Sequence, residues 1–116
     1  MAEAQAEKTP APEPQAAFQP IKVPLRKKIY DKDAAYVSEV EFREPSAGDI
    51  ERCGQPVILD LSYDPPRATF DEKKMTAMIS ALSSVPIGFV RTMHPKDWNT
   101  CAWAIAGFFI PDLGIV

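Results

Sequence analysis

Apolar and polar residues alternate along residues 21–42, and this period of two predicts β-strands. In IKVPLRKKI, the apolar side chains fall on one face of an extended chain. Pro24 has no amide hydrogen for a ladder bond, so we expect this strand at a sheet edge with Pro24 toward solvent. The Asp-rich YDKDAAY is typical of a turn, and AYVSEVEFRE then alternates again. An antiparallel β-hairpin is therefore predicted. The inward residues of its first strand are Ile21, Val23, Leu25 and Ile29.

The stretch FREPSAGDIERCG predicts a sharp corner and a short helix after the hairpin. Pro45 pushes the preceding residue toward extended geometry and ends the strand. Ser46 is placed as an N-cap whose hydroxyl accepts from first-turn amides, and Asp49 adds negative charge near the helix N-terminus. Gly54 suits a left-handed cap at the other end. Arg43 is either solvated at the strand end or forms an ion pair that fixes the corner. No base or nucleophile stands beside the acidic residues, so we interpret the stretch as structural.

The apolar run over residues 57–61 has two interpretations. It is a short third strand or an extended loop pressed onto the core, and its period alone does not decide between them. Thr69 and Glu72, three residues apart, match a capping box and predict the start of a second helix.

That second helix carries apolar residues at the i, i+3, i+4, i+7 spacing, which predicts a stripe packed in the core. The alternative is that Met75 and Met78 form a groove able to adapt to apolar partners. The stripe consists of Met75, Met78, Ile79 and Leu82.

Two further helices are predicted, one beginning at Pro86 and one near Pro95. Trp103 and Phe109 fall off the main apolar stripe of the last helix and, with Ile110, give more apolar surface than a small core needs. Such a surplus commonly marks a contact surface for a partner. Alternatively, the C-terminal residues fold back and cover it. The main stripe consists of Trp98, Cys101, Ile105 and Phe108.

These elements predict a small single α+β domain, with an N-terminal antiparallel hairpin followed by about four short helices. Residues 1–20 contain six Ala and four Pro with one aromatic, too little apolar area to offset the entropy of ordering, so we expect a flexible tail. The domain is expected over residues 21–110, and residues 111–116 form a C-terminal tail. No signal peptide or membrane-spanning run occurs in the sequence, which favours a cytoplasmic protein.

The composition offers little chemistry. A net charge of −3 argues against a general nucleic-acid binder, and the basic run at residues 26–28 lies beside acidic residues, as at a solvated hairpin end. Cys53 and Cys101 have no metal-ligand spacing, so we expect reduced, buried thiols. His94, the one histidine, is expected to cap a helix or to be exposed. We therefore predict no enzyme activity, no cofactor and no metal.

Two motifs carry a family resemblance. The first motif is FREPSAGD, residues 42–49, which matches a signature of arginine, acidic, proline, small, small, glycine, aspartate. The second motif is ALSSVPIGFVRTM followed by HPKDW. It places an aspartate, Asp97, shortly after a methionine, Met93. With its order of elements, the chain over about residues 21–110 resembles the small phage tail assembly chaperones, the family that includes the E protein of temperate myophages and its relative in phage Mu. The Pro-rich start and the YDPPRAT loop have no counterpart in that pattern.

The resemblance implies a binding protein of the host cell cytoplasm that is absent from the mature virion. Such chaperones keep the tape measure protein soluble and help tail tube subunits gather around it. The partner-binding residues are then expected among Trp103, Phe109, Ile110, Met75 and Met78, with a second copy of the chain as a further partner and no nucleic acid or membrane. The alternative is a structural tail or head-tail connector component of the virion.

Overall fold

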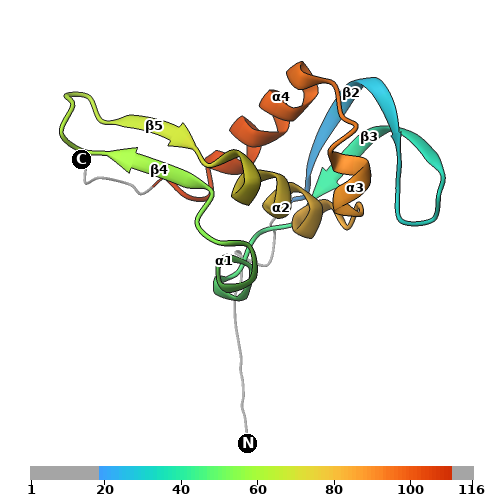
Figure 1. Ribbon diagram of the computed structural model, residues 1–116, viewed down its shortest axis with the longest axis horizontal. Coiled ribbons are helices and arrows are strands. Elements are labelled where there is room, and N and C mark those ends of the chain that lie inside the picture. The colour runs from blue at the N-terminus through green and yellow to red at the C-terminus, as the bar shows by residue number, and fades with distance from the viewer. Residues whose placement is uncertain (1–18, 111–116) are drawn as a thin grey trace, which may run out of the picture.

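Two β-hairpins project from opposite sides of a central group of helices (Figure 1). A computed structural model describes residues 19–110 of the 116-residue chain. The predicted α+β class is confirmed, with an N-terminal antiparallel hairpin and four helices among those residues. The predicted tails lie outside the described residues, except for residues 19 and 20. The elements are β2 (Ile21–Tyr30), β3 (Tyr36–Phe42), α1 (Ala47–Cys53), β4 (Val57–Asp60), β5 (Arg67–Phe70), α2 (Glu72–Ser83), α3 (Ile87–Val90) and α4 (Pro95–Ala106).

The first hairpin pairs β2 with β3 in antiparallel register, from Ile21 opposite Phe42 to Tyr30 opposite Tyr36. The turn between the strands is held by Asp31, whose carboxylate accepts the amides of the residues two and four positions on, both at 2.9 Å. Pro24 is exposed, as predicted for a strand at a sheet edge. The alternating pattern thus places the apolar face of the hairpin against the helices.

A bulge in β2 interrupts the ladder, a feature that the alternation did not predict. Pro24 pairs with Glu39 and Ile29 pairs with Val37, so residues 25–28 stand opposite a single residue of β3. The amides of Arg26 and Lys27 lie within this bulge, turned out of the ladder, and both need another acceptor. Asp97 in the first turn of α4 supplies it.

Asp97 accepts three hydrogen bonds from the bulge. Its carboxylate oxygens lie 3.0 and 2.9 Å from the amide nitrogen of Arg26, and one of them lies 3.1 Å from the amide nitrogen of Lys27. Only 2% of Asp97 is exposed. The side chain of Lys27 also donates to the carbonyl of Thr92 at 3.0 Å. The start of α4 is therefore fastened to the middle of β2.

The second hairpin answers the question left open for residues 57–61. Val57–Asp60 form β4, which pairs antiparallel with β5. Thr69 lies inside β5, so the prediction that it caps the following helix is wrong. Asp71 is the N-cap of α2 instead, and its side chain accepts the amide of Lys74 at 3.0 Å. The capping chemistry is thus present two residues further on.

The core lies between the first hairpin, α2 and α4. The predicted stripe of α2 is confirmed as core, because Met75, Met78 and Ile79 are fully buried and Leu82 is nearly so. Phe42 of β3 packs into the same cluster, and α4 contributes its buried face. That face consists of Cys101, Ala102, Ile105 and Ala106.

The connection between α2 and α4 is tighter than predicted. Pro86 precedes α3, as expected, but the helix ends after four residues. The amides of Thr92 and Met93 each donate to a carbonyl three residues back, which tightens the chain into a turn. Pro95 then favours the extended geometry seen at His94, which separates this turn from α4.

Candidate functional site

The described residues show no metal centre. Across residues 19–110, no three His, Cys, Asp or Glu side chains are grouped so that they could hold an ion. His94 is the N-cap of α4, where its Nδ1 atom accepts the amide of Lys96 at 3.0 Å. None of the helices in this part of the chain has the length and apolar character needed to cross a bilayer.

Both cysteines are free thiols. Burial raises the pKa of Cys101 to about 12, so this thiol carries no reactive thiolate at neutral pH. Cys53 is only half-buried, which corrects the expectation that both thiols lie in the interior. Burial, followed by the nearby Asp49 charge, also raises the pKa of Cys53.

The REPSAGD corner is organised around one buried carboxylate. Arg43 donates to both oxygens of Asp49, with both nitrogen–oxygen distances at 2.8 Å. Arg52 forms a second ion pair with Asp49. Asp49 is fully buried, whereas about half of the Arg43 side chain is exposed. Of the two interpretations of Arg43, the ion pair is therefore the one observed.

The corner places Ser46 at the predicted N-cap position. Ser46 is the N-cap of α1 in extended conformation and forms a capping box with Asp49. The shortest bond of this box runs from the backbone amide of Ser46 to the Asp49 carboxylate, at 2.8 Å, and the Ser46 hydroxyl donates to the same oxygen at 3.3 Å. Asp49 therefore contributes more to capping than its predicted role as a charge near the helix end.

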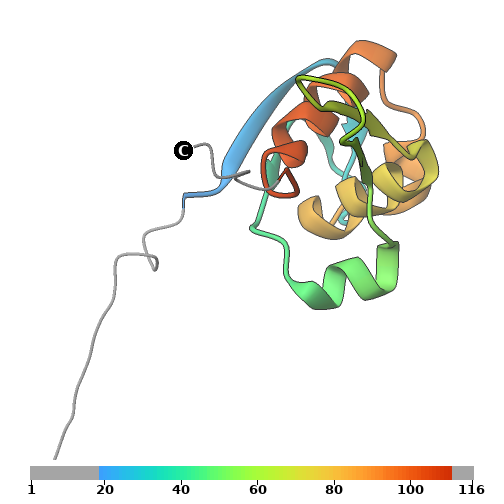
Figure 2. The same ribbon diagram turned by 90° about the vertical axis from the view of Figure 1, so that its left-hand side faces the viewer.

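Gly54 is required where α1 ends. Its φ of 88° lies in the region that favours glycine, although its ψ of 172° differs from the left-handed helical cap that was predicted. A Cβ atom at this position would lie 2.8 Å from the side chain of Lys74. The corner at the edge of the molecule, visible below α2 in Figure 1 and Figure 2, is thus fixed against α2 by close contact.

The charges of the corner lower the pKa of Asp49. Hydrogen bonds from Arg43 outweigh the effect of burial and, with the Ser46 amide, hold the pKa of Asp49 well below its usual range. A carboxyl whose pKa is lowered on folding stabilises the fold above its unfolded pKa of about 3.9, and this contribution is lost as the pH falls.

We expect Arg43 and Asp49 to be energetically coupled at pH 7. In urea titrations of Arg43→Ala, Asp49→Ala and the double variant, the coupling should be about 1–3 kcal/mol, because the pair is bidentate and its acid is buried. It should shrink as the pH is lowered below about 4. Glu44→Ala is the control, since its neighbour Arg43 pairs elsewhere. Additive effects of the two substitutions at pH 7 would contradict this prediction.

An apolar surface lies between the second hairpin and α4. Val57 faces Phe70 across the ladder, and Leu59 faces Ala68, so these four side chains share one face. The ring of Phe70 lies 4.9 Å from the ring of Trp103, edge to face. We call Leu59, Ala68, Phe70 and Trp103 the tryptophan surface.

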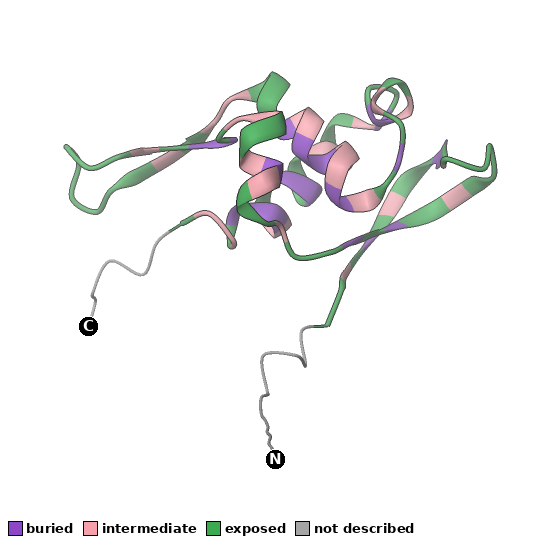
Figure 3. Cartoon of the chain, turned by 90° about the horizontal axis from the view of Figure 1, so that it is seen from below, coloured by how far each residue is buried: buried purple, intermediate pink, exposed green. Residues whose placement is uncertain are grey.

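Trp103 is the most exposed member of this surface, at 58%. Phe70 is half-buried, and its other neighbour is Trp98, whose indole nitrogen donates to Thr76 of α2 at 2.9 Å. The surface therefore rests on a fixed aromatic base. Figure 3 shows buried residues concentrated in the central helices and exposed residues along both hairpins.

The structure separates the five residues predicted to bind a partner. Trp103 and Ile110 are exposed, whereas Phe109 is half-buried and packs against the core. Met75 and Met78 are fully buried, so neither presents any surface to a partner in this conformation. The proposed fold-back of residues 111–116 lies outside the described residues.

Sequence reasoning missed the hairpin's contribution to the exposed apolar residues. Ile58, Leu61 and Tyr63 are each about half exposed or more, and they lie on or beside β4. Alternation in VILDLSYD could have found Ile58, which falls opposite in phase to the buried Val57. Leu61 and Tyr63 share the phase of Val57 but lie beyond Asp60, where β4 ends and alternation no longer applies.

The comparisons with known proteins agree with the motifs. Residues 22–110 match the family model described as phage tail assembly chaperone proteins, E, or 41 or 14. Neither the curated proteins nor the solved structures gave a significant match. The match covers both hairpins, the corner and all four helices among the described residues.

Proposed function

This chain belongs to the family of phage tail assembly chaperone proteins, and from that premise we propose that it binds the tape measure protein and helps tail tube subunits gather around it. Family membership is the observation that carries this proposal. The action is binding, with no chemical step, and takes place in the cytoplasm of the host cell. The protein then leaves the assembly before the virion is complete.

The tryptophan surface supports the proposal. A chaperone for an aggregation-prone polypeptide needs exposed apolar area, because burying apolar surface of both partners drives their association. Trp103 stands out from α4 and is backed by Phe70, so little conformational entropy is lost when a partner covers it. Aromatic side chains with this kind of support commonly dominate interface energetics. Ile110 adds an exposed apolar side chain after the end of α4.

We expect Trp103→Ala to fold normally but to lose binding of the tape measure protein. The side chain is mostly exposed, so its removal should cost the fold little, whereas loss of an interface anchor costs on the order of 2 kcal/mol, or about thirtyfold in affinity. The measurement is co-expression with the tape measure protein of the same phage, followed by the soluble yield and a pull-down.

Tyr36→Ala is the matched control, because Tyr36 is also 58% exposed but lies on the first hairpin. This variant should keep the tape measure protein soluble. Phe109→Ala is expected to lower thermal stability instead, because Phe109 packs against the core. Full chaperoning activity in a stable Trp103→Ala variant would exclude the tryptophan surface as the binding site.

A structural tail or head-tail connector component is the alternative function. Mass spectrometry of purified particles distinguishes the two, because stoichiometric copies in the finished virion are expected only for a structural component.

A further inference from the structure

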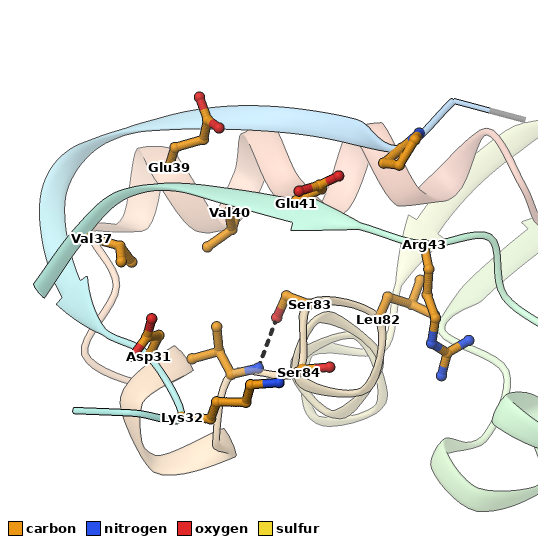
Figure 4. Close-up of a pocket in the computed structure, with 12 residues that line it drawn as sticks. Asp31, Lys32, Val37, Glu39, Val40, Glu41, Arg43, Leu82, Ser83 and Ser84 are labelled. Atoms are coloured by element: carbon orange, nitrogen blue, oxygen red, sulfur yellow. Dashed lines mark hydrogen bonds between the residues drawn. The ribbon is translucent and has the colours of Figure 1, made fainter. Parts of the chain in front are cut away.

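A second surface lies along the free edge of β3, away from the tryptophan surface. Among the residues that the structure describes, β3 has one strand neighbour, β2, so its other edge has no strand beside it. A cavity of about 350 Å³ runs along this edge. The end of α2 and the segment that follows it, residues 82–85, form the opposite wall. Figure 4 shows this arrangement.

The wall already pairs with the edge at one point. The backbone amide of Arg43, just after β3, donates to the carbonyl of Leu82 at 3.1 Å. Further along, Ser83 accepts the amide of Val85, so the wall is held by its own bonds. The remaining edge, over residues 37–41, is open to another backbone.

The two faces of the edge differ in character. Figure 4 shows Val37 and Val40 pointing from β3 toward the end of α2, whereas Glu39 and Glu41 point away from it. Both glutamates are exposed. An added strand would place alternate side chains on these two faces, about 4.8 Å from β3. One set would enter the cavity beside the valines, and the other would lie beside the glutamates.

The charges around the cavity favour a basic partner. Its acidic side chains are Asp31, Glu39 and Glu41, and its basic ones are Lys32 and Arg43. Arg43 is already paired with Asp49, so within the lining Lys32 faces three carboxylates, and outside it Lys22 lies opposite Glu41 across the β2–β3 ladder. Pairing two β3 edges from two copies would bring glutamates opposite one another, which is unfavourable.

We propose that the free edge of β3 binds an extended segment of another protein in which lysine or arginine alternates with small apolar residues. The segment adds a strand to the sheet by backbone hydrogen bonds, its apolar side chains fill the cavity, and its basic side chains meet Glu39 and Glu41. The cavity volume is near the lower end for ligand pockets, about 300–1,000 Å³, and suits a few side chains. Residues 1–18 of this chain are a poor occupant, because Pro10, Pro12 and Pro14 cannot donate ladder bonds.

The test uses a seven-residue synthetic peptide of alternating valine and lysine, with a valine–glutamate peptide as its charge control. Titrated into the ¹⁵N-labelled full chain, the lysine peptide should shift the amide signals of residues 37–41 and Val85, whereas the glutamate peptide should not bind. The Glu39→Lys, Glu41→Lys double variant should bind the lysine peptide about tenfold more weakly. Glu51→Lys, Glu72→Lys is its control, with the same charge change on α1 and α2, and should bind normally.

A lysine peptide with N-methylated ladder amides separates strand addition from charge attraction without altering the chain. The N-methylated peptide should not bind. Binding equal to that of the unmodified lysine peptide would overturn the proposal. Shifts of amide signals centred on β4 and β5 would also overturn it. Deletion of residues 1–18 should leave the affinity unchanged, and a gain would identify that segment as the occupant. Dimers in sedimentation that the β3 charge reversal abolishes would assign the edge to a second copy. None of these results depends on the tape measure protein, so the two proposals fail separately.

Discussion

Asp97→Ala is expected to lower the free energy of unfolding by about 3–5 kcal/mol, which is a large effect for the substitution of one acidic residue. The buried carboxylate accepts three amide hydrogen bonds from the bulge of β2. Removing it leaves the amides of Arg26 and Lys27 without their acceptor and removes the polar link between α4 and the hairpin. Denaturation by urea, followed by circular dichroism, measures the loss.

Glu72→Ala is the control for this variant, because Glu72 is an exposed acid in the first turn of α2 and lacks contacts of this kind. Its loss should reflect only the helix dipole, about 0.3–1 kcal/mol. Asp97→Asn should fall between the two, since an amide oxygen accepts fewer of these bonds. An Asp97→Ala variant no less stable than Glu72→Ala would show that the clamp contributes little.

Met78→Ala is expected to cost about 2–5 kcal/mol, because it removes a fully buried side chain and leaves a cavity in the core. Met78→Leu conserves volume and should cost less than about 1.5 kcal/mol. Thermal and urea denaturation of both variants give these values.

The same pair of variants tests the alternative role of the α2 methionines. If Met78 served mainly as an adaptable contact for a partner, Met78→Ala would remain stable and lose binding of the tape measure protein. Full burial of Met75 and Met78 makes the opposite outcome the expected one.

Local periodicity accounts for the parts of the fold that the sequence predicted. The alternation of the first hairpin and the helical stripe of α2 are patterns of near neighbours, and each was found where expected. β5 was not predicted, because Arg67–Phe70 is only four residues long and follows two prolines. Thr69 matched a capping box by spacing alone, although the strand pairing of β5 placed the helix start at Asp71 instead.

The candidate site was predictable to a similar extent. Trp103 falls off the buried stripe of α4, so its exposure follows from helical geometry. Phe109 lies beyond Ala106, where α4 ends, so a helical stripe no longer describes which way it faces. The ion pair of Arg43 with Asp49 joins residues six apart through a corner, so the spacing of the residues did not identify the partner. Contacts across a turn depend on backbone angles that spacing does not reveal.

The bond between Asp97 and the β2 bulge also sets an order for folding during synthesis. The two ends of this contact are about 70 residues apart in the chain, and synthesis proceeds from the N-terminus. The first hairpin can form early, but the amides of Arg26 and Lys27 cannot bond to Asp97 until the start of α4 has been synthesised. The domain therefore completes its fold only when nearly all of the described chain has left the ribosome, which is when its binding surfaces first become available together.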